Sequence, residues 1–427
     1  MISTNLRSKV YEGAKAKNLA ISDMVFDRIV KELSVIEELE LMECFWIYSM
    51  IADICNQNNW LRTPGRNTSC GSLVAYCLDI TKVNPMENNL IFERFVNPLL
   101  FGHADIDIDV PLGKRILLIE ELKKLIPTYE ISFVAFIPYD NDPTDYKKVI
   151  IDGVEYCEHT CAIIINPIDT QINVAKASVN GVIYYVINDK PNDYLKLDRY
   201  RYDILELVYL SKLEAISNQL SSKYHPYNID LADKSTFYFL SSGSDFSNLF
   251  QFSNQIIKDA FVSFKPKNIN ELAIINSLAR PSCEHLIKQL IDNKSLGYED
   301  IFQNDRRVDD LLKETYGVLI YQETFLLLLN TIAGIEMQRA AWYSRVLMIN
   351  RDVKSVNEFY LEFFDGCNKC STLTDSEITE LMELIKNNIK FLFLKSHALS
   401  YSTVSYWGAF YKVNFKNEFG LAMLKDN

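Results

Sequence analysis

The stretch 103–110 constrains this chain more than any other, because acidic and apolar residues alternate along it. The acidic positions are Asp105, Asp107 and Asp109, and the apolar positions are Ile106, Ile108 and Val110. An alternation with a period of two predicts a β-strand with one apolar face and one carboxylate face. Three carboxylates on one face need cations or basic groups opposite them, unless the strand is an edge strand whose acidic face is solvated. Divalent cations with oxygen ligands are the usual partners, and a pair of such ions suits phosphoryl transfer.

The size and composition of the chain limit its architecture and surroundings. At 427 residues it exceeds one ordinary hydrophobic core, so we expect two or three subdomains. Nine cysteines are an odd count without framework spacing, which favours reduced thiols. Neither a signal peptide nor an apolar run of membrane-spanning length is found, so a cytoplasmic protein is predicted. The net charge of −12 argues against nonspecific coating of nucleic acid, but it is compatible with a local basic channel.

The segments before the acidic strand are expected to be helical and then to form a loop that binds anions. Residues 27–42 carry apolar residues at helical spacing, and 43–58 indicate a largely buried helix. A loop with Pro, Gly, hydroxyl and Arg side chains then leads into a helix at 73–81. Backbone amides at a helix start, together with hydroxyl and guanidinium donors, form an anion site. Arg66, Asn67, Thr68 and Ser69 are therefore candidates for contact with a triphosphate, although such loops are common.

The order of these segments resembles the catalytic palm of bacterial family C DNA polymerases, the DNA polymerase III alpha-subunit group. That family has a Pro-Gly-Arg-Gly-Ser loop, a Gly-Ser-Leu-Val-Ala-Tyr helix, a Phe-Glu-Arg-Phe segment and an Asp-x-Asp-x-Asp strand. Here they correspond to 64–69, 71–76, 92–95 and 105–109. Further resemblances follow at 201–207, at 316–323 and at 395–398, so the likeness covers roughly residues 25 to 420.

The resemblance implies an α+β fold, with a nucleotidyltransferase-type mixed-sheet palm and a mainly helical fingers region. Palm strands are expected at the acidic stretch and at 131–137, 160–166, 181–187 and 199–204. Residues 1–60 are expected to be a helical N-terminal part of the palm, and 61–227 the catalytic palm. A reduced thumb is expected within about 111–158 of that range. Residues 228–427 are expected to form the helical fingers.

The resemblance also assigns roles to residues. Asp107, Asp109 and Asp203 match the family's catalytic aspartates, which hold two Mg²⁺ ions, with Mn²⁺ as an alternative. Asp105 is expected to support the strand, and Asp198 is a rival for the third position because it also ends a short alternating run. The expected nucleotide-binding residues are Arg66, Asn67, Thr68, Ser69, Arg94, Arg201, Arg345, Lys395 and His397. For Arg94, a structural ion pair with a carboxylate is an equal alternative to phosphate binding.

Two cysteine groups also allow a zinc hypothesis. Cys157, His159 and Cys161 would share one face of a strand, and Cys367 and Cys370 lie three residues apart. A closed zinc site needs four defined ligands, and neither group has a convincing partner pair. His159 is therefore expected to be a core residue or a residue behind the site.

The departures from the family pattern shape the functional hypotheses. Asn67 replaces a loop glycine, Ser344 replaces an arginine, and the segment between Asp109 and His159 is short. No phosphoesterase domain precedes the palm and no clamp-binding region follows the fingers, so a compact, non-replicative polymerase without proofreading is expected. Its partners would be primer-template DNA, dNTPs and another protein subunit that helps to hold DNA, with no membrane. A template-independent nucleotidyltransferase and a catalytically inactive DNA- or protein-binding subunit remain the alternatives.

Overall fold

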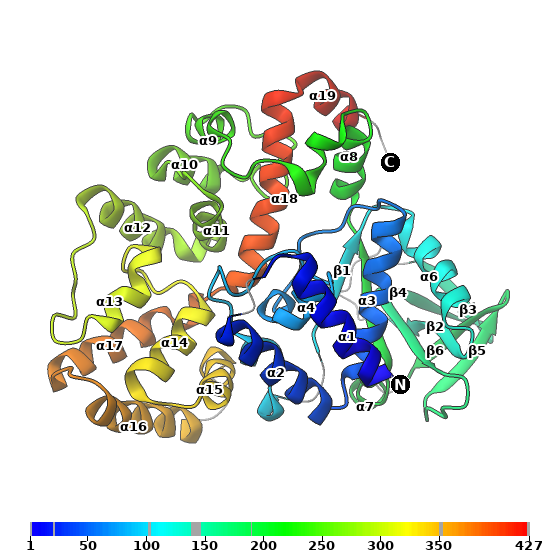
Figure 1. Cartoon of the computed structure of the whole chain (residues 1–427), viewed down its shortest axis with the longest axis horizontal. Helices are drawn as coiled ribbons and strands as arrows, with labels where there is room; N and C mark the ends of the chain where they lie inside the picture. Colours follow the sequence, from blue (N-terminus) through cyan, green and yellow to red (C-terminus); the bar gives the residue numbers. More distant parts are fainter. Residues whose placement is uncertain are drawn as a thin grey trace.

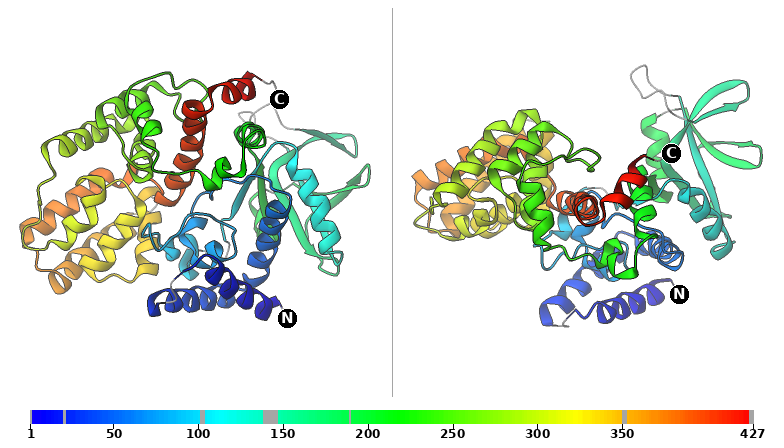
Figure 2. Two further views of the ribbon diagram at one scale, coloured as in Figure 1. Left: turned by 45° about the horizontal axis from the view of Figure 1, so that its top comes forward. Right: turned by 90° about the horizontal axis from the view of Figure 1, so that it is seen from above.

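A computed structural model of the chain describes residues 2–19, 22–100, 104–137, 147–188, 190–349 and 353–424. One mixed sheet lies at one side of the molecule, and a group of helices lies at the opposite side (Figures 1 and 2). The long helix α18, Lys395–Asn414, runs between them. The expected α+β class, with a mixed sheet and a mainly helical second part, is confirmed.

The sheet has seven strands in the order β1-β7-β4-β2-β6-β5, with β3 paired to β4. The strands are β1 Asp107–Val110, β2 Tyr129–Phe136, β3 Lys148–Ile151, β4 Val154–Pro167, β5 Ala175–Val179, β6 Val182–Ile187 and β7 Arg201–Glu206. The β1–β7 and β2–β6 pairs are parallel, and the other pairs are antiparallel. The expected strands at 131–137, 160–166, 181–187 and 199–204 are confirmed as β2, β4, β6 and β7. The strands β3 and β5, which are short and partly exposed, were not predicted from the sequence.

The acidic strand is shorter than its sequence pattern predicts. Pairing with β7 begins only at Asp107, and residues 101–103 lie outside the described ranges. The carbonyl of Ile106 accepts a hydrogen bond of 2.6 Å from the Tyr48 hydroxyl, so a side chain takes the place of a ladder partner there. The predicted two-faced character is nevertheless present, because Ile106, Ile108 and Val110 are buried.

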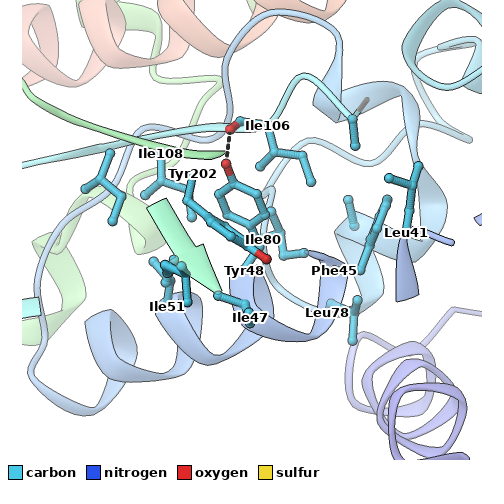
Figure 3. Packing of buried hydrophobic residues seen from close by; sticks show 14 of the residues in the cluster. Leu41, Phe45, Ile47, Tyr48, Ile51, Leu78, Ile80, Ile106, Ile108 and Tyr202 are labelled. Carbon is cyan, nitrogen blue, oxygen red and sulfur yellow. Dashed lines mark hydrogen bonds between the residues drawn. The ribbon is translucent and has the colours of Figure 1, made fainter. Parts of the chain in front are cut away.

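The apolar face of β1 packs on helix α3, Met42–Gln57, as Figure 3 shows. The Tyr48 hydroxyl of this helix also accepts the backbone N–H of Asp203 at 3.0 Å. One buried tyrosine therefore links the two strands that carry the acidic residues. Helices α1, Ile2–Ala16, and α2, Asp23–Glu38, complete the N-terminal helical part, and α2 and α3 lie where helices were expected.

The remaining helices fall into two groups along the chain. Before residue 228 they are α4 Leu73–Cys77, α5 Phe92–Phe95, α6 Lys114–Leu125, α7 Lys190–Leu197 and α8 Val208–Ser217. After it they are α9 Lys234–Ser241, α10 Gln255–Phe264, α11 Ile269–Leu278, α12 Glu284–Leu296, α13 Arg307–Leu312, α14 Gln322–Ala333, α15 Met337–Ile349, α16 Val353–Cys370, α17 Asp375–Asn388, α18 and α19 Lys416–Leu424. No strand is found among the described residues after 228, apart from an isolated bridge between Tyr321 and Phe393.

The range expected to hold a reduced thumb contains strands of the sheet. Within 111–158 the structure describes α6, β2, β3 and the start of β4, whereas 138–146 lie outside the described ranges. Since β2 lies between β4 and β6 in the sheet, much of this range contributes to the sheet itself. The division into palm, thumb and fingers stays a prediction.

Candidate active site

Three carboxylates gather where β1 and β7 lie side by side. The parallel register pairs Asp107 with Asp203 and Asp109 with Leu205, so the two strands bring residues from distant parts of the chain together. Asp109 is 1% exposed and Asp203 is 8% exposed, whereas Asp105 lies at the surface. Buried carboxylates need compensation by cations or hydrogen-bond donors, and the structure supplies both.

Arg66 is the cation shared by the two carboxylates of β1. Its Nη1 donates to Asp109 Oδ1 at 2.9 Å, and its Nε lies 3.2 Å from Asp107 Oδ2. The loop that carries Arg66 thus reaches the acidic strand. A guanidinium group suits this position, because its planar fork presents several donors to carboxylate oxygens.

Asp109 is also held by two hydroxyl groups. Thr63 Oγ1 donates to Asp109 Oδ2 at 2.9 Å, and the Tyr401 hydroxyl donates to the same oxygen at 3.0 Å. Arg66 Nη1 donates to the Tyr401 hydroxyl at 3.1 Å, so the three groups form one connected network. Helix α18 therefore contributes directly to the carboxylate site.

Asn67 connects the same loop to Asp107 and to α18. Its Nδ2 donates to Asp107 Oδ2 at 2.6 Å, and its backbone N–H donates to His397 Nδ1 at 3.3 Å. Its carbonyl accepts from Ser396 Oγ at 2.6 Å. With φ at 50°, Asn67 adopts the left-handed conformation that a glycine would take without a side chain. The replacement of the family's glycine thus adds an amide contact to Asp107.

Asp203 has its own partners on β7 and β4. Arg201 Nε donates to Asp203 Oδ2 at 3.1 Å, and Cys161 Sγ lies 3.6 Å from Asp203 Oδ1. The rival carboxylate, Asp198, lies on a short 3₁₀ turn, and its Oδ1 is 3.3 Å from Arg201 Nη1. Of the two acidic residues, Asp203 is the one that shares a register position with Asp107.

Burial and the neighbouring charges shift the pKa values of Asp107 and His397. Burial, and then the charges of Asp105 and Asp203, raise the pKa of Asp107 to about 7, although Arg66 opposes this shift. Burial and the neighbouring Arg66 lower the pKa of His397 to about 4. At neutral pH the His397 ring is therefore uncharged, and it stacks on Tyr401 with 4.2 Å between ring centroids.

The carboxylates have the chemistry that divalent cations require. Oxygen donors on adjacent strands, with negative charge in excess over Arg66 and Arg201, suit Mg²⁺ or Mn²⁺. As the side chains stand, no three His, Cys, Asp or Glu residues within the described ranges form a metal-holding group. Asp107 and Asp109 are engaged by Arg66, and Asp203 by Arg201. The same finding covers the cysteine groups at 157–161 and at 367–370, and every cysteine of the chain is a free thiol.

His159 and the loop hydroxyls have local structural contacts. His159 Nδ1 accepts the backbone N–H of Ala162 at 3.1 Å, next to the candidate site. Thr68 and Ser69 are buried, and Ser69 Oγ donates to the Arg66 carbonyl at 2.7 Å.

The helix start behind the loop is already capped within the protein. The buried carboxylate of Glu32 accepts the backbone N–H groups of Leu73 and Val74, both at 3.0 Å. These α4 amides therefore donate to Glu32, and not to the triphosphate that the sequence predicted at this helix start.

Of the other expected cations, Lys395 and Arg94 are held by neighbours. Lys395 is buried, with its Nζ 2.6 Å from Glu314 Oε2, and Arg94 Nε donates to Gln322 Oε1 at 2.7 Å. Arg345 is exposed and close enough to Arg94 that its charge, after burial, lowers the pKa of that guanidinium. The structure thus brings Arg66, Asn67, Arg201 and His397 to the carboxylates, whereas the role of each as a nucleotide contact stays a prediction.

Three residues of the network were missed by the sequence analysis. They are Thr63, Tyr401 and Tyr48. Tyr401 could have been found, because it lies four residues after His397 and so on the same helix face. Thr63 and Tyr48 carry no such signal, since common polar and aromatic residues gain these contacts only through the fold.

Comparisons with known proteins cover most of the chain. Residues 4–137 match the family described as "Bacterial DNA polymerase III alpha NTPase domain", and residues 207–371 match "Bacterial DNA polymerase III alpha subunit finger domain". The DNA polymerase III subunit alpha of Mycoplasma pneumoniae is 26% identical over 99% of this chain and 54% of its own length. That of Mycoplasma genitalium is 28% identical over 93% and 52%, and that of Borreliella burgdorferi is 27% identical over 97% and 41%.

The chain spans about half the length of the curated relatives it matches most fully. No helix in the described ranges is both long and apolar enough to cross a lipid bilayer.

Proposed function

Since this chain belongs to the bacterial DNA polymerase III alpha-subunit family, we propose that it is a DNA-directed DNA polymerase. It would add deoxynucleotides from dNTPs to the 3′-hydroxyl of a primer. The observation that carries this proposal is the register of β1 and β7, which sets Asp203 beside Asp107 on the strand pair that also holds Asp109. Arg66, from the loop before these strands, supplies the neighbouring positive charge.

Asp107, Asp109 and Asp203 are proposed to hold two Mg²⁺ ions, with Mn²⁺ as an alternative. Such ions, when bound, lower the pKa of the primer hydroxyl and neutralise charge on the triphosphate. Burial and the neighbouring carboxylates together raise the pKa of Asp107 to about 7, and a site of this kind favours added positive charge, which supports this assignment.

Arg66 is proposed to serve two partners in turn. Without nucleotide it neutralises Asp107 and Asp109, and with nucleotide its guanidinium binds triphosphate oxygens while Thr63 and Tyr401 keep Asp109 oriented. Arg201 orients Asp203 in the same way. Guanidinium groups bind carboxylate and phosphate with the same fork of donors, so this exchange needs no new chemistry.

His397 is proposed to contact the incoming nucleotide as a neutral hydrogen-bond donor. Its Nδ1 accepts the amide of Asn67, so the ring proton belongs on Nε2, which is left for a ligand. Arg345 is exposed and suits contact with the nucleotide or the DNA backbone, whereas Lys395 is paired with Glu314. Primer-template DNA, dNTPs and a further protein subunit that helps to hold DNA are the proposed partners.

Primer extension tests this proposal when it compares variants of two aspartates that both pair with Arg201. Asp203→Asn should abolish incorporation of dNTPs in Mg²⁺. Asp198→Asn is the matched control, because Arg201 also pairs with Asp198, and it should keep most of the activity. Both variants should unfold at similar temperatures, which excludes a general loss of structure.

Reactions with and without template complete the experiment. Extension that needs both template and Asp203 would support a DNA-directed polymerase. Extension that persists without template would instead favour the terminal nucleotidyltransferase alternative. Full activity of Asp203→Asn, or equal loss in both variants, would contradict the proposed role of the strand pair.

A further inference from the structure

A cavity lies behind the loop that reaches the carboxylates. It has a volume of about 430 Å³, and its walls come from Lys17 just after α1, from Pro64 of the loop, from residues within 76–88 and 226–231, from the start of α11 and from α18. The side chains that matter here are Lys17, Tyr76, Lys82, Glu87, Tyr227 and Trp407. This volume falls in the range of small-molecule sites, which bury most of a ligand in a concave and partly apolar pocket.

Two lysines of the cavity wall, together with the buried Arg62, surround the single carboxylate of Asp79. Lys17 Nζ lies 2.8 Å from Asp79 Oδ1, and Lys82 Nζ lies 2.6 Å from Asp79 Oδ2. The fully buried guanidinium of Arg62 lies 3.3 Å from the same Oδ2. Burial, and then the charge of Arg62, lower the pKa of Lys82, although the charge of Asp79 opposes this shift.

Aromatic rings stand beside the two lysines. Lys17 Nζ is 4.4 Å from the ring centroid of Tyr76, and Lys82 Nζ is 4.6 Å from that of Tyr227. Trp407 packs edge-on against Tyr227, and its indole N–H has no hydrogen-bond partner in the described part of the chain. A ligand with both an anionic group and a flat ring would match the lysines and the rings together.

We propose that this cavity binds a phosphorylated nucleoside, with its phosphate at Lys17 and Lys82 and its base against the tyrosine and tryptophan rings. Glu87, whose carboxylate accepts from Asn84 Nδ2 at 2.9 Å, has acceptor capacity left for ribose hydroxyls or a ring amino group. The ligand is either a free nucleotide or one nucleotide of a single strand, since both present the same chemistry.

The cavity is connected to the carboxylate site through shared elements. Leu399, Thr403 and Trp407 of α18 line the cavity, while His397 and Tyr401 of the same helix contact the carboxylate network. The Tyr227 hydroxyl hydrogen-bonds both the N–H and the carbonyl of Arg62, each at 2.9 Å, and so holds the start of the loop. Occupancy of the cavity would therefore stiffen the loop that carries Thr63 and Arg66.

Binding of ADP, measured by equilibrium dialysis in EDTA, tests the proposal without the metal-dependent site. The full chain should bind ADP more tightly than it binds adenosine or pyrophosphate alone. Lys17→Gln and Lys82→Gln should each weaken ADP binding about tenfold, because each removes a charge-assisted hydrogen bond to phosphate. Lys82→Arg should retain ADP binding because it conserves the charge. If Lys82→Gln fails to fold, this variant and Lys17→Gln still test the role of the charge.

Lys294→Gln is the matched control for Lys17→Gln. The Lys294 side chain is 16% exposed against 20% for Lys17, and it pairs with Glu271 and lies over the Phe264 ring. Its loss should leave ADP affinity unchanged. If a short oligodeoxynucleotide competes with ADP, the natural ligand is one nucleotide of a single strand. If it does not compete, the ligand is a free nucleotide.

Three results for ADP itself, and a fourth for pyrophosphate, would overturn the proposal. The first three are no ADP binding at millimolar concentration, equal affinity in the wild type and both glutamine variants, and binding that disappears in Asp107→Asn. The third result would mean that ADP occupies the carboxylate site instead. Pyrophosphate binding as tight as that of ADP would remove the nucleoside from the ligand class and contradict the role given to the rings.

Discussion

The loop at 62–67 contributes one arginine to each of two ion clusters with opposite charge excess. Arg66 joins a cluster in which Asp107, Asp109 and a neighbouring Asp203 outnumber the cations. Four residues earlier, Arg62 joins Lys17 and Lys82 around the single carboxylate of Asp79. The first cluster favours added cations, whereas the second favours added anions.

The two clusters also affect the aspartates in opposite directions. The pKa of Asp107 is raised to about 7, mainly by burial and by its acidic neighbours. Burial also raises the pKa of Asp79, but the charges of Lys82, Arg62 and Lys17 outweigh it and bring that pKa well below its usual range. The comparison shows that burial alone does not set the sign of such a shift, because the neighbouring charges decide it.

The largest effect is expected from Asp107→Asn. Nucleotide incorporation should fall by about a thousandfold, the equivalent of roughly 4 kcal/mol of transition-state stabilisation. The measurement is primer extension under single-turnover conditions in Mg²⁺. Asp105→Asn, two residues away and exposed, is the control and should lose no more than about threefold. Equal losses in both variants would remove the distinction between the two positions.

Asp79→Asn should destabilise the fold, because it leaves Lys17, Arg62 and Lys82 without their shared counter-charge. We expect a loss of about 2–3 kcal/mol in the free energy of unfolding, measured with urea. Asp245→Asn is the matched control, since Asp245 pairs with Lys412 at 3.1 Å but its side chain is 71% exposed. That control should change stability by no more than about 0.5 kcal/mol. A cost for Asp79→Asn as small as that of the control would contradict the proposed charge excess.

The pH dependence of stability should differ in sign between the two aspartates when no divalent metal is present. Because the folded-state pKa of Asp107 is raised, its ionisation opposes folding as pH rises from about 4 to about 7. Asp79 has a lowered pKa, so its contribution is present above about pH 4 and is lost at lower pH.

Urea unfolding in EDTA across this range measures the difference. Asp107→Asn should be more stable than the wild type at pH 8, by on the order of 1–2 kcal/mol, and about equally stable at pH 4. Asp79→Asn should be less stable than the wild type at pH 8. A wild-type advantage over Asp107→Asn at pH 8 would contradict the charge excess assigned to the carboxylate cluster.

Tyr401→Phe is expected to have the smallest effect. It removes the hydroxyl that donates to Asp109 and accepts from Arg66, so kcat/KM should fall by about three- to tenfold. Tyr406→Phe on the same helix is the control, because its hydroxyl donates to the carbonyl of Asp230 at 2.9 Å, away from the carboxylates. It should lower stability and leave kcat/KM unchanged. A larger catalytic loss in Tyr406→Phe would mean that α18 acts through its packing alone.

A local pattern in the sequence predicted the acidic strand. The alternation of Ile106, Ile108 and Val110 with acidic residues identified the apolar face of β1, whereas Asp203 on β7 was identified through the family resemblance. The alternation is informative because strand periodicity is local. The register that sets Asp107 beside Asp203 was expected only through the family resemblance.

The contacts that complete the site could not be predicted in this way. Tyr401 and Asp109 are hydrogen-bonded although 292 positions separate them in the sequence, and Lys395 and Glu314 although 81 positions separate them. Glu32, which accepts the amides of α4, comes from α2, for which the sequence predicted a helix with an apolar face and no contact to the loop. These partners depend on tertiary packing, which neither periodicity nor loop composition encodes.

Binding of Mn²⁺, followed by electron paramagnetic resonance, tests the contrast between the two clusters most directly. The wild type and Asp79→Asn should bind Mn²⁺ alike, because Asp79 belongs to the cation-rich cluster. Asp107→Asn should weaken binding by at least about tenfold, since it removes a carboxylate ligand and one negative charge. Equal Mn²⁺ affinity in the wild type and Asp107→Asn would contradict the assignment of the strand carboxylates as the metal site.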